Sequence, residues 1–239
     1  MIPVSKPKIT KLDINKVLKS LRDGWVSSDG PDVLKFEKKF ANFIGKKYCI
    51  SVSSGTAALE IAVKSLNLKK NDEVIIPNFT IISNALAVIR QGAKPVFVDC
   101  NMDDWNININ DLKKKISKRT KLIFVENPGS NTFEFQDLSK MISLAKKHKV
   151  LTAIDNTWGT PYFLKPIKLG FDMSIVSATK YYSGHSDVMG GTLAVNKKVF
   201  KLVEPTNRVT GFRLSPDDAY LILRGIRTLD VRMDKHHIN

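Results

Sequence analysis

The feature that most constrains the fold is a regular alternation of short apolar runs with longer helical patterns between residues 48 and 196. Each run is four or five residues long and rich in Val and Ile, which is typical of strands buried on both faces of a sheet. The strands are predicted at Tyr48–Val52, Glu73–Ile76, Pro95–Val98, Leu122–Val125, Val150–Ile154, Met173–Val176 and Thr192–Val195. The alternation therefore predicts an α/β fold, in which a mostly parallel seven-stranded sheet lies between helices.

Helices are predicted between and around these strands. Apolar residues recur at helical spacing in Asn15–Arg22, Val33–Phe43, Ala57–Leu66, Ile81–Arg90, Ile109–Ile116 and Leu138–His148. Ser215 followed by Pro216 has the pattern of a helix N-cap and first helical position, which predicts a last helix over Asp217–Lys235. We expect an N-terminal arm and helix in residues 1–30, a large domain in residues 31–214, and the start of a long helix in residues 215–239.

The composition excludes some classes of protein. The net charge is +15, but the lysines are scattered along predicted helix faces, which does not favour a nucleic-acid-binding protein. No run of 18 apolar residues predicts a membrane span, and the N-terminus lacks the pattern of a secretory signal, so we expect a cytoplasmic protein. Cys49 and Cys100 have no metal-ligand spacing and are expected to be free, buried thiols.

Two polar motifs follow predicted strands at the edge where ligands of parallel sheets bind. Ser53-Ser54-Gly55-Thr56 ends a strand and opens a helix, so its unpaired N–H groups suit a phosphate, although a plain helix cap has the same pattern. Asp155 ends another apolar strand, where a carboxylate is costly unless it is paired. It is either the partner of a pyridine nitrogen in a pyridoxal 5′-phosphate (PLP) site or an ordinary turn residue.

Two further residues complete a candidate PLP site. Lys180 follows an apolar strand amid Ser, Thr, Tyr and Gly, which favours an imine-forming lysine over a plain surface lysine. The hydroxyls of Ser177 and Thr179 precede it and are expected to bind the same phosphate. Phe79 follows a strand as well, and its ring is predicted either to stack on the cofactor or to pack in the core. Together these residues indicate a PLP site, with no metal.

Two parts of the chain resemble two families. Residues from about 1 to 125 resemble the DegT/DnrJ/EryC1/StrS sugar aminotransferases, through SVSSGTAALEIAVKSL and NDEVIIPNFTIISNALAV. Residues from about 121 to 237 resemble cystathionine β-lyase, of the Cys/Met-metabolism PLP-dependent enzymes, through SIVSATKYYSGHSDVMGGT and SPDDAYLILRGIRTLDVRMDKHH. Both families have the aspartate-aminotransferase fold, bind PLP and form at least dimers, so the resemblance implies a homo-oligomer.

The resemblance also assigns roles. The lyase part implies that Lys180 forms the imine, that Asp155 pairs with the pyridine nitrogen, and that Ser177 and Thr179 hold the phosphate. The aminotransferase part implies that Gly55 and Thr56 hold the phosphate and that Phe79 lies on the ring. The N-terminal Tyr and Arg of the lyase family, the lysine motif of the aminotransferase family, and the C-terminal domain of both are absent from the sequence.

Three functions follow from these resemblances. The first is a PLP-dependent carbon–sulfur β-lyase acting on cystathionine or a related small amino acid, because the reactive lysine lies in the lyase-like part. The second is a PLP-dependent nucleotide-sugar aminotransferase. The third is a chain that binds PLP or folds without turnover. In addition, Leu221, Leu223, Ile226 and Leu229 are expected to be exposed on the last helix, which predicts self-association or aggregation.

Overall fold

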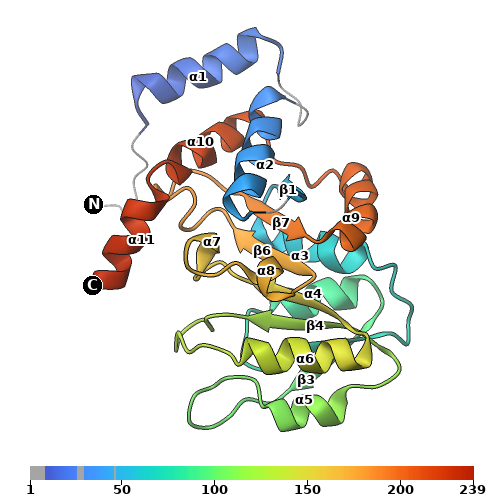
Figure 1. The fold of residues 1–239 in the computed structure, drawn as a ribbon. Helices are drawn as coiled ribbons and strands as arrows, with labels where there is room; N and C mark the ends of the chain where they lie inside the picture. The colour runs from blue at the N-terminus through green and yellow to red at the C-terminus, as the bar shows by residue number, and fades with distance from the viewer. Residues whose placement is uncertain (1–8, 26–29, 46) are drawn as a thin grey trace, which may run out of the picture.

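The computed structural model describes residues 9–25, 30–45 and 47–239. A seven-stranded sheet runs through the molecule in the order β1-β7-β6-β5-β4-β2-β3 (Figure 1). Its strands are β1 (Cys49–Val52), β2 (Glu73–Pro77), β3 (Lys94–Val98), β4 (Thr120–Glu126), β5 (Leu151–Asp155), β6 (Met173–Ser177) and β7 (Gly191–Val195). All seven strands predicted from the sequence are present, and the fold class is confirmed.

The direction of the strands decides where ligands bind. The pairs β2–β3, β2–β4, β4–β5 and β5–β6 are parallel, whereas β7 is antiparallel to both of its neighbours, β1 and β6. Six strands therefore run the same way, and only β7 is reversed. As a result, the carboxyl ends of β1, β4, β5 and β6 all lie at one edge of the sheet.

Helices cover both faces of this sheet. They are α1 (Lys11–Arg22), α2 (Pro31–Phe43), α3 (Gly55–Lys64), α4 (Ser83–Arg90), α5 (Ile109–Lys115), α6 (Leu138–His148), α7 (Thr160–Phe163), α8 (Pro166–Leu169), α9 (Lys197–Thr210), α10 (Pro216–Ile226) and α11 (Leu229–Ile238). One face packs against α3, α4 and α9. The other packs against α2 and α10 at one end and against α5 and α6 at the other (Figure 1).

Successive side chains of one strand serve the two faces. In β4, Leu122 and Phe124 pack against α3 and α4, whereas Ile123 and Val125 pack against α5 and α6. All four side chains are almost fully buried, and burial of such side chains contributes roughly 2 kcal/mol each. This explains why the strands read as continuous apolar runs rather than as alternating ones.

The C-terminal helix differs from the prediction. A single helix was expected over Asp217–Lys235, but the chain forms α10 and α11, with a break at Arg227 and Thr228. The apolar residues of this segment are also not exposed as expected. Leu223 and Leu229 are buried, and Leu221 and Ile226 are half-buried against the same cluster, because α10 packs directly on α2. The predicted aggregation through these residues therefore loses its basis.

Other features of the chain differ in smaller ways. Helix α9 was not predicted, and α1 begins before the expected Asn15 because Thr10 and Asp13 form a capping box. Both cysteines are free; Cys49 is buried, but Cys100 is only half-buried because it lies beyond the end of the edge strand β3. None of the helices in the described residues is long and apolar enough to cross a membrane.

Candidate active site

A cavity of about 410 Å³ lies at the edge where the six parallel strands end. Its walls come from the ends of β1, β2, β4, β5 and β6 and from the segments that follow these five strands. The lining residues are Ser54, Gly55, Thr56, Leu59, Ile81, Glu126, Ser130, Asp155, Thr157, Trp158, Ser177, Thr179, Lys180 and Met189. The structure thus brings together six of the seven residues proposed from the sequence, namely Gly55, Thr56, Asp155, Ser177, Thr179 and Lys180.

The first turn of α3 forms one wall of this cavity. Ser54 is its N-cap, and the Ser54 side chain accepts a hydrogen bond from the Ala57 amide at 3.0 Å. The amides of Gly55 and Thr56 come earlier in the helix, where no preceding turn supplies a carbonyl partner. A Cβ atom on Gly55 would lie 2.9 Å from Cβ of Ser177, so only glycine allows the two segments to approach this closely. The helix end and the Ser177 hydroxyl therefore face the same space, which suits an anion.

Asp155 is the last residue of β5. Its Oδ1 accepts a hydrogen bond from the Thr157 amide at 2.9 Å. Burial raises the pKa of Asp155 to about 6, the negative charge of Glu126 adds to this rise, and the hydrogen bonds with Thr157 oppose it. A cation placed beside Asp155 would favour the ionised carboxylate. A protonated pyridine nitrogen is such a cation.

Lys180 lies in the turn that follows β6. Its amide donates a hydrogen bond to the carbonyl of Ser177 at 3.2 Å, and its carbonyl accepts one from the Gly184 amide at 2.9 Å. The side chain is exposed and lines both the 410 Å³ cavity and an adjoining cavity of about 840 Å³. Lys180 therefore lies at the boundary between the 410 Å³ cavity and the 840 Å³ cavity.

Thr179, next to Lys180, is tied to the start of β7. Its hydroxyl accepts a hydrogen bond from the Gly190 amide at 3.1 Å. The wall that carries Lys180 is consequently joined to the segment that leads into β7, whose Met189 also lines the cavity.

Sequence reasoning missed a second carboxylate in the cavity. Glu126 ends β4 beside Asp155, its register partner on β5, and it is 5% exposed. It accepts hydrogen bonds from Thr80 at 2.7 Å and from the Ser130 hydroxyl, to which the indole N–H of Trp158 donates at 3.2 Å. The signal that identified Asp155, an acidic residue at the end of an apolar strand, is also present in LIFVE and would have found Glu126.

Phe79 is the one predicted site residue that does not line the cavity. Its ring packs on Trp105, with centroids 5.1 Å apart. This contact holds the ring against the loop that carries Trp105, and Phe79 does not line the cavity. In its place, Ile81 and Trp158 supply apolar walls.

The chain matches the family model of the Cys/Met metabolism PLP-dependent enzymes over residues 25–239. The chain belongs to this family. PLP is therefore the cofactor that its membership implies, and the residues around the cavity fit that cofactor. They offer an anion site at α3, a carboxylate that a cation would ionise, and a lysine in the facing turn.

The chain is also similar to individual lyases. The chain is 34% identical to cystathionine β-lyase of Bordetella avium and 36% identical to cystathionine γ-lyase of Homo sapiens, and these matches cover 84% and 85% of it. The crystal structure of cystathionine γ-lyase from Lactobacillus plantarum complexed with L-serine superposes with a TM-score of 0.76 at 27% identity, over 85% of this chain and 53% of that one. The chain spans 50% of the length of both curated relatives.

The Cys/Met family model also decides between the two resemblances. It begins at residue 25 and so includes most of the part that resembles sugar aminotransferases. The relatives named above are lyases, and nothing in these comparisons supports the aminotransferase alternative.

Proposed function

We propose that this chain uses PLP, bound through Lys180, to break the carbon–sulfur bond of cystathionine or a related sulfur amino acid. The observation that carries the proposal is the meeting of Lys180, Asp155 and the N-terminus of α3 around one 410 Å³ cavity. Membership of the Cys/Met family and similarity to cystathionine β- and γ-lyases support this choice of reaction.

Each residue of the cavity has a proposed task. The amides of Gly55 and Thr56 and the hydroxyls of Ser177 and Thr179 hold the cofactor phosphate. Asp155 keeps the pyridine nitrogen protonated. When bound, PLP supplies an electron sink that makes the α-proton of the amino acid acidic.

Lys180 carries the proton chemistry. Once its amine is free, Lys180 would remove the α-proton of the substrate as a general base. The β-carbon–sulfur bond then breaks and the sulfur leaves as a thiolate. With water, the remaining carbon skeleton is released as pyruvate and ammonia. Leu59, Ile81 and Met189 supply apolar surface in the walls of the cavity.

The test compares the chain with Lys180→Ala, and with Lys201→Ala as a control for an exposed lysine on α9. The chain is incubated with PLP, reduced with borohydride, and digested for mass spectrometry. Thiol and pyruvate release from cystathionine are then measured. We expect the cofactor on Lys180 alone, and at least about a 10³-fold loss of pyruvate release in Lys180→Ala.

Two outcomes contradict the proposal in different ways. Attachment that persists in Lys180→Ala at another lysine contradicts the assignment of Lys180. Attachment at Lys180 without thiol release from any sulfur amino acid contradicts the lyase reaction. Formation of 2-oxoglutarate from glutamate would instead indicate amine transfer.

A homo-oligomer is a further part of the proposal. It rests on the family resemblance, since Leu221, Leu223, Ile226 and Leu229, the apolar residues expected to be exposed, pack within the chain. Size-exclusion chromatography with light scattering tests it, and a monomer at micromolar concentration contradicts it.

A further inference from the structure

The segment that follows Lys180 is held from behind by α10 and α11. Residues 181–187 leave the Lys180 turn and pass along these two helices before β7 begins. We propose that Arg232 of α11 is a positioning residue, which fixes the backbone next to Lys180 and thereby the direction in which the Lys180 amine points. This inference rests on the proposed role of Lys180 as the residue that binds the cofactor.

Arg232 makes three hydrogen bonds with its guanidinium group. Nη1 donates to the carbonyl of Tyr181 at 2.6 Å, Nη2 to the carbonyl of Gly225 at 2.7 Å, and Nε to the Thr228 hydroxyl at 3.2 Å. The guanidinium group thus links α11 to Gly225 of α10 and to Thr228, which precedes α11. Its remaining partner, Tyr181, is the residue directly after Lys180. Charge-assisted bonds of this kind are stronger than neutral ones.

The backbone of α10 meets the same segment directly. A Cβ atom on Gly225 would overlap the carbonyl oxygens of Tyr182 and Ser183, so glycine is needed at this contact. Ser183 is itself tied to the turn, since its hydroxyl donates to the carbonyl of Thr179 at 2.9 Å. Three consecutive residues directly after Lys180, at 181–183, therefore contact the C-terminal helices, and Ser183 links them back to the turn.

A second arginine secures the far end of the segment. Arg224 pairs with Asp187, and it also lies 2.8 Å from Oδ2 of Asp13 on α1. Both carboxylates are 2% exposed, so the pairs are shielded from solvent. The segment is consequently held at both ends, by Arg232 near Lys180 and by Arg224 near the 840 Å³ cavity that Asp187 lines.

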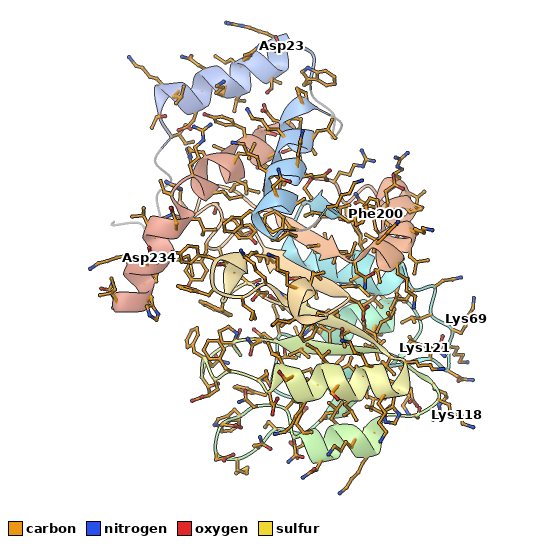
Figure 2. All side chains as sticks on the ribbon, in the orientation of Figure 1. Asp23, Lys69, Lys118, Lys121, Phe200 and Asp234 are labelled. Atoms are coloured by element: carbon orange, nitrogen blue, oxygen red, sulfur yellow. The ribbon has the colours of Figure 1, made fainter. Side chains whose placement is uncertain are left out.

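Helix α11 is well placed to act as a support. The Tyr162 hydroxyl of α7 donates a hydrogen bond to Asp234 at 2.7 Å, and Met233 and Leu229 are buried in the cluster under α10. Asp234 is labelled in Figure 2, where α11 lies next to the segment that carries α7. A helix anchored in this way restrains the turn through Arg232.

The test compares Arg232→Met with Arg227→Met, a control in which the replaced arginine is exposed at the end of α10. Two ligands are titrated into each variant: PLP, whose aldehyde reacts with Lys180, and pyridoxamine 5′-phosphate, which has the same ring and phosphate but no aldehyde. We expect Arg232→Met to weaken PLP binding about tenfold more than pyridoxamine phosphate binding. Arg232→Lys, which keeps the charge, should recover part of the loss.

Hydrogen exchange of the cofactor-free chain gives a second readout. We expect the amides of residues 181–187 to exchange faster in Arg232→Met than in the original chain and in Arg227→Met. Unchanged exchange there, or equal losses for both ligands, overturns the positioning role. If the original chain fails to attach PLP to Lys180, the proposed function fails, whereas the exchange result still decides whether Arg232 holds the segment.

Discussion

Two carboxylates, those of Glu126 and Asp155, line one small cavity, and the pKa of Asp155 is raised as a result. Burial removes water from the carboxylate, and Glu126 on the neighbouring strand adds a like charge. Both effects favour the protonated form, which raises the pKa of Asp155 from 3.8 to about 6. Glu126 has two hydroxyl donors, whereas the hydrogen bonds of Asp155 come from Thr157. A cation beside Asp155 would offset both effects and favour the ionised carboxylate.

The first prediction concerns the pH dependence of stability. Because the folded-state pKa of Asp155 is raised, the folded chain binds this proton more tightly than the unfolded chain. The contribution is fully present below pH 4 and is lost as the pH rises through about 6. We expect Asp155→Asn, which still accepts from Thr157, to raise the free energy of unfolding of the cofactor-free chain by about 1–3 kcal/mol at pH 7.5.

Urea unfolding at pH 4.5 and pH 7.5 checks this prediction. The gain from Asp155→Asn should be clearly smaller at pH 4.5. An equal gain at both values would mean that the substitution acts through packing and not through the charge.

At the scale of single elements, the start of a helix was easier to predict from sequence than a break within a long helical pattern. Ser215 and Pro216 placed the start of α10 correctly, because an N-cap is a local signal. The break after α10 lies two residues beyond Gly225, but a single glycine inside a helical pattern does not by itself predict a break. The contact of Gly225 with the turn after Lys180 is a tertiary one, which the sequence pattern does not show. Helix α9 was missed because Pro205 interrupts its pattern. Its packing includes Phe200, labelled in Figure 2, which stacks on Tyr48 from a distant part of the chain.

The second prediction tests the cap of α10. The Ser215 hydroxyl accepts from the Asp218 amide and donates to the Asp218 carboxylate at 2.7 Å. We expect Ser215→Ala to lower the free energy of unfolding by about 1 kcal/mol, since an N–H group of the first turn loses its partner. Ser139→Ala, at an exposed position inside α6, is the control and should change stability by less than about 0.5 kcal/mol. Equal effects in thermal or urea unfolding would contradict the capping role.

At the scale of the whole molecule, the sheet, the place of the site and six of its residues followed from sequence, but the position of Phe79 and the presence of Glu126 did not. The edge where β1, β5 and β6 end is set by strand order, which is why Gly55, Asp155 and Lys180 meet there. The position of a ring such as that of Phe79 depends on how a loop bends, and here Trp105 decides it. Residues 1–8, 26–29 and 46 lie outside the part that the structure describes, so the arm predicted over residues 1–30 is tested only in part.

The third prediction concerns the net charge of +15. Like charges at this density repel one another, and salt screens that repulsion with a Debye length of about 10 Å at 0.1 M. Lys69, Lys118 and Lys121 are labelled on one side of the view in Figure 2, and Nζ of Lys121 lies 3.6 Å from Oδ1 of Asp72. We expect an increase from 20 to 300 mM NaCl to raise the melting temperature of the cofactor-free chain by roughly 2–4 °C. A decrease would show that ion pairs outweigh the repulsion.

The reversal of β7 has a consequence for how the site can change. A strand that runs back against β6 must begin where β6 ends, so residues 178–190 leave and return at the same side of the sheet. A parallel neighbour would have required the chain to cross to the opposite side before returning. Insertions or deletions in this hairpin connection would therefore alter the shape of the two cavities and leave the hydrogen-bonded ladder of the sheet intact.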